Sequence, residues 1–585
     1  MNSDRLLKHF EAISESDDAV LHLRQFVLEL AVRGKLVEQD ADDLPASELM
    51  NRIERDKSRL AKSGKVRLET ALAPIDIIPY AIPRAWVWVR LGSTGRIFNG
   101  NSVSEGVKRT LARVKDGYPF VATKDVGYGR DELNYENGLR VPQREVGYKV
   151  AHKDAILICA EGGSAGRKIG ITDRDICFGN KLYANEVLDG INPRYIFYVY
   201  QTPSFFKEFA SRMTGIIGGI ARSEFVMLPV PVPPEKEQHR IVAKLDQLME
   251  LCDELEAART RRETRRNHLV AATLHRLNNG NASPEAGNDT DFKQTARFYI
   301  NHLQRFAARS EHIKQLRQTI HNLALQGKLV QQDPADEPVD HLLTRILLER
   351  AKLNRTTTSA AQTMEEGITL NYDIPKTWKW RSLDDLIVFG PTNGFSPKAV
   401  DFKTPVRSLT LSATTSGHFK EEHSKYIATK IPADSDLWLK DGDILVQRGN
   451  TIEYVGVAAI YWGEPNRFIY PDLMMKIRVS SELNLRYVHL AMSQDAARDF
   501  LRARASGTSG TMPKINQTTL RSLPLPIPPI AEQHRIVAKV DELMSLCDEL
   551  EVQLTTTATT RHQLLEATLY EALSGASAKQ VETTP

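Results

Sequence analysis

The sequence predicts a mixed α/β protein in which two globular α/β domains are joined by long helices. A set of helical and proline-rich segments occurs twice in the chain, in the same order. Each set surrounds a long insert with many short runs of β-branched and aromatic residues, which favour strands. Each set ends in a stretch whose apolar residues alternate between spacings of four and three, which is typical of a coiled-coil helix.

The composition is that of a globular protein with several domains. A chain of 585 residues is too long for a single core, and we expect about three to five units. With 41% hydrophobic and 26% charged residues and a mean hydropathy of -0.35, the composition excludes disordered and membrane proteins. Residues 1–20 contain no signal-peptide core and no transmembrane run, so we expect a cytoplasmic protein. A net charge of +3 and a pI near 8.4 permit nucleic-acid binding without requiring it.

The four cysteines are expected to be free thiols. Cys159, Cys177, Cys252 and Cys547 lie far apart and form no C-x-x-C pair, which argues against a disulfide framework and against a structural zinc site. We therefore assign no metal site to this chain.

The repeated segments are unmistakable. Residues 228–256 read LPVPVPPEKEQHRIVAKLDQLMELCDELE, and residues 523–551 read LPLPIPPIAEQHRIVAKVDELMSLCDELE. Upstream, LRQFVLELAVRGKLVEQD from Leu23 matches LRQTIHNLALQGKLVQQD from Leu316, and PRAWVWVRLG matches PKTWKWRSLD. The inserts at 93–222 and 385–517 share little sequence. Two large copies do not suit a solenoid, so we expect a pseudo-dimer made from one chain.

Each copy opens with amphipathic helices. The Leu23 segment continues through PASELMNRIERDKSRL and its counterpart through PVDHLLTRILLERAKL, both with apolar residues at helical spacing. Polar linkers follow, SGKVRLETALAP and NRTTTSAAQTMEEG, and we place domain boundaries there.

The inserts predict α/β domains that end in an extended strip. Short β-rich runs such as DAILICA, RKIGITD, DGDILVQRG, YVGVAAIYW and LMMKIRV are separated by glycines and loops. The closing strip of each insert is too rich in proline to be helical. Its prolines are Pro229, Pro231, Pro233 and Pro234 in the first copy and Pro524, Pro526, Pro528 and Pro529 in the second.

A long helix follows each strip. If the first runs from about Glu235 to Leu277, its length is roughly 60 Å, enough to hold two domains apart. Its apolar residues predict a coiled-coil seam in which a cysteine acts as a small apolar side chain. The seam residues are Ile241, Leu245, Leu248, Cys252 and Leu255 in the first helix and Ile536, Val540, Leu543, Cys547 and Leu550 in the second.

The string LPxPxPPxxEQHRIVAKxD opens a long helix twice, each time after a variable insert, and so resembles the specificity subunits of type I restriction-modification systems. The resemblance covers nearly the whole chain. It implies two target recognition domains separated by conserved helices that pack as an antiparallel coiled coil, with an approximate two-fold axis. This chain also carries a GKL-type helical segment before each insert, so we expect its conserved blocks to be a circular permutation of those in some relatives, and the exact helix pairing stays open.

The resemblance divides the chain into seven parts. They are an N-terminal helical region (1–80), a first target recognition domain (81–233), a central coiled-coil helix (234–277), a linker with a helical region (278–371), a second target recognition domain (372–528), a C-terminal coiled-coil helix (529–574) and a flexible tail (575–585).

The resemblance also implies partners. Each recognition domain would read one half of a split, asymmetric site in double-stranded DNA, and the coiled coil would fix the spacing of the halves. Two methyltransferase subunits would dock on the helices, and motor-nuclease subunits would join the full complex. S-adenosylmethionine, ATP and Mg²⁺ would bind to those partners, and this chain would bind none of the three. The target adenine would be flipped into a pocket of the methyltransferase.

No catalytic residue is assigned, because the expected motifs are missing. An adenine methyltransferase should carry N-P-P-[FYW], and the nearest string is Asn192-Pro193-Arg194. The glycine-rich strings from Glu161 and Gln447 do not fit a phosphate-binding G-x-x-x-x-G-K-[ST] loop. A nuclease needs paired carboxylates with a lysine, and Asp472 with Lys476 offers only one acid.

His239 and His534 occupy equivalent positions in the two EQHRI strings. Acid–base catalysis is one interpretation of them. A helix cap or an interface with a partner is simpler, since both histidines lie at the start of a repeated helix.

Basic and amide side chains in the glycine-rich loops are the candidate DNA contacts. Arg and Lys can pair with guanine and Asn with adenine, but half or more of protein–DNA hydrogen bonds go to the backbone, and a solvated charge is the alternative for each residue. The candidates are Lys124, Arg167, Lys168, Asn180 and Lys181 in the first domain and Arg448, Asn450, Lys476, Lys514 and Asn516 in the second. The basic run Arg259, Arg261, Arg262, Arg265 and Arg266 is a further candidate for phosphate contacts, with a solvated or partner-facing surface as the simpler interpretation.

Two other functions are compatible with parts of the sequence. One is a self-contained DNA enzyme, which the missing motifs argue against. The other is a non-specific coiled-coil DNA-binding scaffold, which would not need two elaborate and divergent domains at matched positions.

Overall fold

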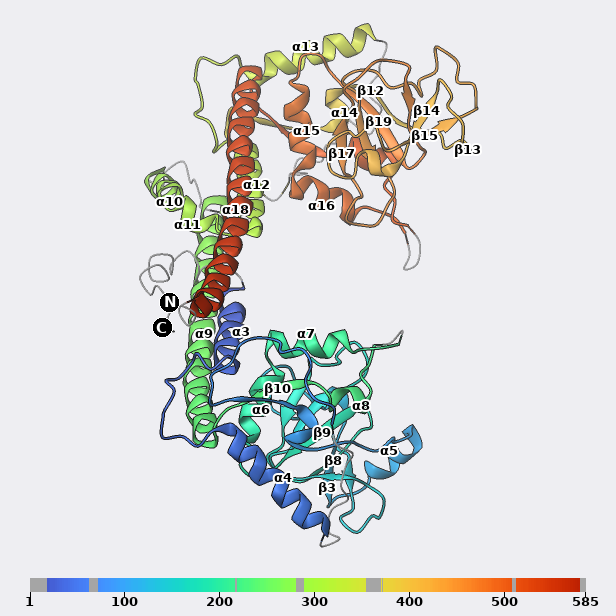
Figure 1. Ribbon diagram of the computed structural model, residues 1–585. Helices are drawn as coiled ribbons and strands as arrows, with labels where there is room; N and C mark the ends of the chain where they lie inside the picture. Colours follow the sequence, from blue (N-terminus) through green and yellow to red (C-terminus); the bar gives the residue numbers. More distant parts are fainter. Residues whose placement is uncertain are drawn as a thin grey trace. The chain divides into compact units, whose positions relative to one another are not determined.

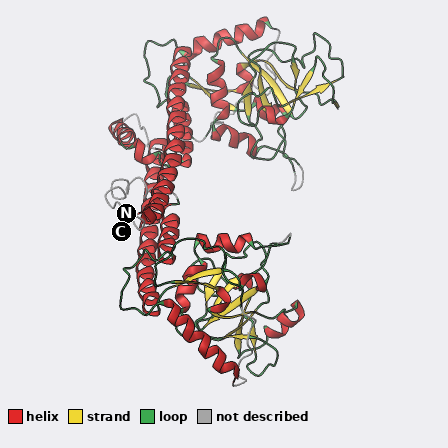
Figure 2. Ribbon diagram, in the orientation of Figure 1, coloured by secondary structure: helices red, strands yellow, loops and turns green. Residues whose placement is uncertain are grey.

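The computed structural model describes residues 18–62, 72–215, 218–279, 289–353, 370, 372–507 and 512–578. The predicted linkers and tail lie wholly or partly outside them. The chain divides into two compact units, Met1–Glu263 with Thr557–Pro585, and Thr264–Thr556. Within each unit the strands gather in a globular part, and helices border it (Figure 1, Figure 2). The predicted mixed α/β class, with two repeated domains and long helices, is confirmed.

The first domain contains two four-stranded sheets. One has the order β2, β9, β6, β7, with all neighbours antiparallel. The other has the order β4, β3, β8, β5, with β3 parallel to β8. The strands are β2 (Gly95–Asn99), β3 (Tyr118–Val121), β4 (Arg140–Val141), β5 (Val150–Ala151), β6 (Ile156–Cys159), β7 (Ile169–Ile171), β8 (Ile176–Phe178) and β9 (Leu182–Val187), and the helices are α5 (Glu105–Leu111), α6 (Pro193–Tyr200), α7 (Pro203–Ser211) and α8 (Arg222–Phe225).

The second domain repeats this topology with one change. Its sheets have the orders β12, β19, β16, β17 and β13, β15, β14, β18, with β14 parallel to β18. The edge strand differs, because β5 pairs with β8 in the first domain whereas β13 pairs with β15 in the second. The elements are β12 (Ile387–Asn393), β13 (Ala399–Val400), β14 (Arg407–Leu409), β15 (Ser424–Ile427), β16 (Ile444–Gln447), β17 (Ala458–Ile460), β18 (Phe468–Ile469), β19 (Met474–Val479), α14 (Leu383–Leu386), α15 (Leu485–Ser493), α16 (Asp495–Ala503) and α17 (Gln517–Arg521).

The proline strips are strands, as predicted. β10 (Pro229–Val232) pairs antiparallel with β1 (Val87–Arg90), and β20 (Pro524–Ile527) pairs antiparallel with β11 (Lys379–Ser382). Each ribbon has only two strands, so proline, which lacks an N–H, costs few ladder hydrogen bonds. The ribbons close each domain by bringing its first and last strands together, a pairing that the sequence did not indicate.

A continuous apolar run becomes the central strand of each domain. In β6 every residue is buried, with Ile156 and Ile158 in one core and Leu157 and Cys159 in another. Alternate side chains of a strand point to opposite faces, so an unbroken apolar run is required where both faces are covered. β16 in the second domain is likewise buried on both faces.

We use the word frame for the repeated segments that precede and follow each insert. Outside the two domains the frame consists of helices. Among the described residues its helices are α3 (Ala19–Val32), α4 (Ala46–Lys62) and α9 (Glu235–Asn279) in the first copy and α12 (Ser310–Leu325), α13 (Val339–Lys352) and α18 (Ile530–Ala578) in the second. The helices α10 (Asp289–Asn301) and α11 (Leu303–Phe306) lie between α9 and α12 in the chain. The predicted helices at 45–60, 338–353 and 235–277 are confirmed. No helix in the described ranges combines the length and the apolarity needed to cross a membrane.

In the first unit, α3 contacts both long helices. Arg24 of α3 pairs with Asp253 and Glu256 of α9 at 2.6 and 2.7 Å. Its Phe26 packs in one cluster with Leu565 of α18. The last part of α18 therefore belongs to the unit that contains the first part of α9.

In the second unit, α12 makes the equivalent contacts. Arg317 pairs with Asp548 of α18 at 2.6 Å. His312 Nε2 lies 2.8 Å from Asn267 Oδ1 of α9, and the Asn278 amide donates to Thr319 at 3.3 Å. Each short helix is thus packed against the beginning of one long helix and the end of the other.

The side chains of the predicted coiled-coil seam differ in how deeply they are buried. Ile241 and Leu245 belong to the core of the first unit, and Ile536 and Val540 to the core of the second. The beginning of each long helix is therefore packed on its own domain. Buried seam residues are Ile241, Leu245, Cys252, Ile536, Val540 and Cys547, and half-buried ones are Leu248, Leu255, Leu543 and Leu550. Pairing of the two long helices as an antiparallel coiled coil stays a prediction.

The glycine of each GKL string ends the preceding short helix. Gly34 and Gly327 have φ of +66° and +67°, a left-handed conformation that glycine adopts without strain. A Cβ at Gly34 would lie 2.3 Å from Pro83 Cγ, and one at Gly327 would lie 2.3 Å from Pro375 Cγ. Both the turn and the close approach therefore require glycine.

We expect Gly34→Ala and Gly327→Ala each to lower the free energy of unfolding by about 3 kcal/mol, because backbone strain adds to a clash with a proline ring. Scanning calorimetry of the full chain measures this as a lower Tm. Gly138→Ala is the matched control, since Gly138 has φ +79° with nothing within 4 Å of its added Cβ. It should cost only about 1 kcal/mol, and an equal loss in Gly34→Ala would show that the proline contact is unimportant.

Candidate nucleic-acid interface

A buried carboxylate joins three segments of the frame in each unit. Trp86 Nε1 donates to Glu237 Oε2 at 2.9 Å, and Gln39 Nε2 donates to Glu237 Oε1 at 2.6 Å. We call these three residues the Glu237 junction. It connects the start of α9 to the segment after α3 and to the residue before β1, and Glu237 is only 1% exposed.

The second unit contains the same arrangement, the Glu532 junction. Trp378 Nε1 donates to Glu532 Oε2 at 3.0 Å, and the Gln332 amide donates to the other oxygen. The repeated tryptophan, glutamine and glutamate of the sequence are thus explained by one interaction.

Burial raises the pKa of the Glu237 carboxyl above its ordinary value, and the hydrogen bonds from Trp86 and Gln39 lower it by less. The pKa of Glu532 is raised for the same reasons. Both carboxylates accept hydrogen bonds from donors of the frame, so the geometry gives them a structural role.

The rest of the EQHR string is also structural. Gln238 accepts from the Asn192 backbone N–H at 2.8 Å and donates to the Pro233 carbonyl at 3.1 Å, which holds the strip, α6 and α9 together. His239 is exposed and lies 3.1 Å from the Asn192 amide. Arg240 pairs with the buried Asp43 at 2.6 Å. His534 repeats the histidine contact at 2.9 Å from Asn484.

The Asn192-Pro193-Arg194 string, which resembles part of a methyltransferase motif, is a helix start. Asn192 is the N-cap of α6, its side chain accepting from the backbone N–H groups of Arg194 and Tyr195. Proline follows at the first helical position, where its missing N–H costs nothing. Asn484 caps α15 in the second domain in the same way.

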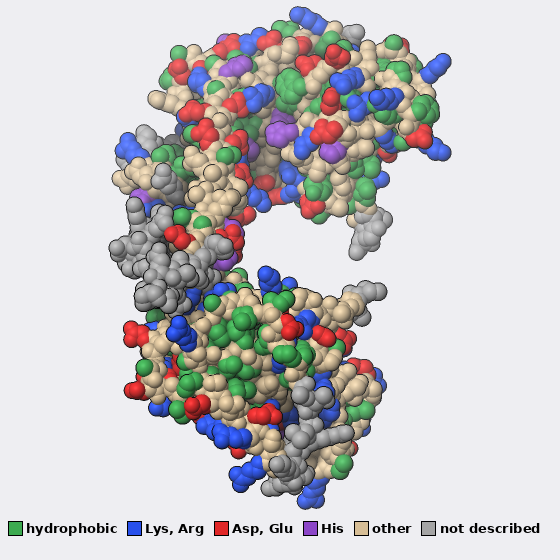
Figure 3. All heavy atoms as spheres, in the orientation of Figure 1, with side chains coloured by type: hydrophobic (Ala, Val, Ile, Leu, Met, Phe, Trp, Pro, Cys, Tyr) green, Lys and Arg blue, Asp and Glu red, His purple; other side chains and the backbone are tan. Residues whose placement is uncertain are grey.

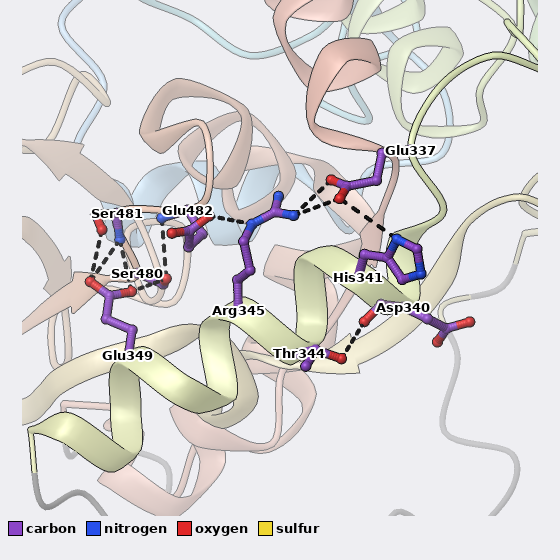
Figure 4. Close-up of polar contacts among 9 residues, drawn as sticks. All are labelled: Glu337, Asp340, His341, Thr344, Arg345, Glu349, Ser480, Ser481 and Glu482. Atoms are coloured by element: carbon purple, nitrogen blue, oxygen red, sulfur yellow. Dashed lines mark hydrogen bonds and ion pairs between the residues drawn. The ribbon is translucent and has the colours of Figure 1, made fainter.

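Helix α13 is fastened to the second domain by charged side chains (Figure 4). The Arg345 guanidinium bridges Glu337 at 2.7 Å and Glu482 at 2.6 Å. Glu349 accepts hydrogen bonds from Ser480 and from the hydroxyl of Ser481, the latter at 2.8 Å. These contacts fix the helical region of the frame on the end of β19.

The candidate DNA contacts of the first domain surround the loop after β6. Lys168 Nζ donates to the Thr123 carbonyl at 3.2 Å, and Lys181 pairs with Glu161 at 3.3 Å. The guanidinium of Arg167 lies 5.3 Å from the centre of the Phe206 ring. Lys124, Arg167, Asn180 and Lys181 are exposed, and Lys168 is half-buried.

In the second domain four of the five candidates lie at or near the surface. Arg448 Nε donates to the Ile515 carbonyl at 3.2 Å, and Asn450 donates to Gln447 at 2.8 Å. Lys514 is exposed and forms a β-bridge with Gly449. Asn516 is exposed and caps α17. The loop after β6 and the equivalent loop after β16 each carry two candidates, Arg167 with Lys168 and Arg448 with Asn450, whereas the other candidates lie at positions that do not correspond.

The prediction that Lys476 contacts DNA is wrong. Its side chain is 2% exposed, and its ammonium donates to the carbonyls of Asp436 and Trp438 at 2.6 and 2.8 Å. It also lies 3.7 Å from the buried carboxylate of Asp443. Burial lowers the pKa of this lysine. An ammonium enclosed and hydrogen-bonded in this way cannot reach DNA, and the sequence misled because Lys476 lies on β19 and points inward.

Sequence reasoning missed the loop that follows β3. Tyr128 in this loop is 55% exposed, and its ring centre lies 5.3 Å from Lys168 Nζ. A lone exposed aromatic between two glycines, in the string VGYGR, is the signal that could have identified it. The basic run on α9 is mostly exposed, with Arg259 and Arg266 half-buried.

Charged side chains of both signs are mixed over the visible face of each unit (Figure 3). This matches the small net charge of +3.

All four cysteines are buried free thiols, and burial raises the pKa values of Cys252 and Cys547. Such thiols are poor nucleophiles, so the two seam cysteines act as packing residues.

Residues 83–263 and 375–559 each match the type I restriction modification DNA specificity domain. The chain belongs to this family. It is 28% identical to the type I restriction enzyme EcoEI specificity subunit of Escherichia coli, over 94% of this chain and 93% of that protein. It is also 28% identical to the EcoAI specificity subunit of Escherichia coli, over 93% and 92%.

A crystal structure of the HsdS subunit from Thermoanaerobacter tengcongensis is similar at 16% identity, covering 85% of this chain and 98% of that one with a TM-score of 0.39. The two matched ranges of the family begin beside Trp86 and Trp378 and continue into α9 and α18. Each family domain therefore includes two of the three parts of a carboxylate junction.

We expect Trp86→Phe and Trp378→Phe each to lower the free energy of unfolding by about 2 kcal/mol, because a buried carboxylate loses a donor. Thermal denaturation followed by circular dichroism measures the loss. Trp88→Phe is the control: Trp88 Nε1 donates only to a backbone carbonyl, that of Tyr80 at 3.3 Å, in a half-buried site. Losses of equal size in Trp86→Phe and Trp88→Phe would mean that the Glu237 junction contributes no more to the free energy of unfolding than an ordinary half-buried hydrogen bond.

Proposed function

We propose that this chain is the DNA specificity subunit of a type I restriction-modification enzyme and that each domain reads one half of a bipartite, asymmetric DNA site. One observation carries the proposal: the two domains share the order of their central strands and the same attachment to the frame, yet their inserts share little sequence. A protein that reads two different sequences at a fixed separation needs this combination.

Catalysis belongs to partner subunits in this proposal. The relatives are specificity subunits by name, and this chain would recognise the DNA sequence at which the complex acts. Methyltransferase subunits would bind S-adenosylmethionine and modify adenine, and motor-nuclease subunits would use ATP and Mg²⁺ for restriction. An adenine inside a duplex has to be flipped out of the stack before methylation, and the pocket that receives it would lie in the methyltransferase.

The long helices fix the spacing of the two halves in this proposal. A straight α-helix gives a defined rise of about 1.5 Å per residue, which a flexible linker does not. Each helix starts at a carboxylate junction, so its first turn is tied to the domain that precedes it. Pairing as an antiparallel coiled coil would make the spacing rigid.

Two copies of one partner fit a repeated apolar stripe on the long helices. Leu251 of α9 is 58% exposed and Leu546 at the equivalent position of α18 is 46% exposed. Half-buried leucines flank each of them, at 248 and 255 and at 543 and 550. Exposed leucines in a helical row favour docking of a partner helix. The stripe occurs twice in the same sequence, which supports two methyltransferase subunits.

A non-specific coiled-coil DNA-binding scaffold is the alternative. It predicts equal affinity for all duplexes at a stated salt concentration, because phosphate contacts carry no sequence information. Competition binding with unrelated duplexes separates the two functions.

Exchange of residues 93–222 for the matching insert of another specificity subunit should change one half of the methylated site and leave the other half and the spacing unchanged. The reason is that the frame and the second domain are untouched. Long-read sequencing of modified bases, in cells carrying the chain with its partners, reads the site directly. A change in both halves would contradict the assignment of one domain to each half, and an unchanged methylome after deletion of the gene would contradict the proposed function.

Leu251→Asp and Leu546→Asp should each remove one methyltransferase subunit from the complex, and the double variant should remove both, because a charge in an apolar interface is left unpaired. Native mass spectrometry counts the subunits. Val146→Asp is the control, since Val146 is 95% exposed and lies in the segment between β4 and β5 of the first domain rather than on a long helix. A double variant that keeps two methyltransferase subunits would place the docking surface elsewhere.

A further inference from the structure

The loop after β3 of the first domain holds an exposed aromatic side chain in a fixed conformation. The Tyr128 backbone N–H donates to Asp131 Oδ2 at 3.0 Å. Gly127 has no room for a side chain, because a Cβ there would lie 2.2 Å from Asp131 Cβ. Gly129 has φ +62°. The two glycines therefore permit a tight loop that presents Tyr128 to the surface.

Contacts on both sides of Tyr128 tie this loop down. On one side, Tyr128 forms a β-bridge with Lys168, and its hydroxyl lies 3.4 Å from Ser164 Oγ. On the other side, Arg130 pairs with Asp253 of α9 at 2.9 Å. A large side chain left exposed on a rigid loop loses little conformational freedom on binding, which favours a contact role.

The second domain offers an internal comparison. The short 3-10 helices η2 (Thr123–Asp125) and η4 (Leu411–Ala413) follow β3 and β14, and the next residues read VGYGR in one domain and TTSGH in the other. In the second domain the buried Gln447 holds the loop, donating to Thr414 Oγ1 at 3.1 Å and Thr415 Oγ1 at 3.3 Å. The loops correspond in position but present different side chains, with Ser416 where the first domain has Tyr128.

We propose that Tyr128 is a specificity-determining residue of the first domain, its ring and hydroxyl contacting a base edge in the half-site that this domain reads. The inference rests on the proposed function and deepens it. A phenol offers an apolar ring edge for a thymine methyl group and one hydroxyl that donates to or accepts from a base. The ammonium of Lys168 beside the ring supplies attraction to the adjoining phosphates.

The test uses the full chain assembled with its methyltransferase partner and duplexes that carry the methylated site. Tyr128→Ala should weaken binding to the cognate duplex about tenfold, while binding to a duplex with a scrambled first half changes by less than about twofold. Single base-pair changes should show that discrimination is lost at one position of the first half and kept throughout the second. The first half is the one that changes when residues 93–222 are exchanged.

Two further variants make the result specific. Val146→Ala, at a 95% exposed apolar site of the same domain, should leave binding unchanged. Tyr128→Phe keeps the ring and the fold, and should retain part of the affinity but reduce discrimination at the same base pair. The melting temperature of each variant should lie close to that of the wild type, because both positions are exposed and the backbone contacts of the Tyr128 loop are kept.

The outcomes separate the two levels of the argument. A wild-type complex that binds all duplexes equally would overturn the proposed function together with this inference. A wild-type preference that survives Tyr128→Ala unchanged would overturn the inference alone. Equal weakening for every duplex would assign Tyr128 to the sugar-phosphate backbone and would also overturn it.

Discussion

The buried glutamate at the start of each long helix is the interaction on which the frame depends. Glu237 and Glu532 accept hydrogen bonds from a tryptophan indole and a glutamine amide, which come from two segments far away in the sequence. A buried carboxylate without these donors would be strongly unfavourable, so the helix, the GKL segment and the first strand of the domain have to meet. The same hydrogen bonds that stabilise the junction therefore also determine which segments of the chain pack together.

This constraint explains how the inserts can diverge. Each domain is closed by a two-stranded ribbon, and the strand that leaves the domain leads directly to a carboxylate junction. The ribbon itself is built from β1 and β10 in the first domain and from β11 and β20 in the second, at the beginning and the end of each domain. Residues such as Tyr128 and Ser416 can differ between the domains while the orders of the central strands stay the same. A reader of two unrelated half-sites requires this separation between a constant attachment and a variable surface.

The long helices combine two kinds of contact. Their first turns pack on the domain that precedes them, through Ile241 and Leu245 in α9. Their last turns pack against a short helix of the frame, as Leu565 of α18 does with Phe26 of α3. The exposed leucines of the apolar stripe, Leu251 in α9 and Leu546 in α18, lie between these two regions. A helix held at both ends can present its middle to a partner without losing its own support.

The sequence by itself determined the repeat, the extended proline strips, the long helices and the family resemblance, because these depend on local spacing and on identity between two copies of one chain. It did not determine which polar side chains face outward. The sequence predicts that Lys476 contacts DNA, but this side chain lies enclosed beside Asp443, and the exposure of Tyr128 is visible only in the structure. The pairing of β1 with β10 was equally invisible. Only the tertiary structure decides such points, because strand pairing and burial depend on contacts between residues far apart in the chain, which local pattern does not encode.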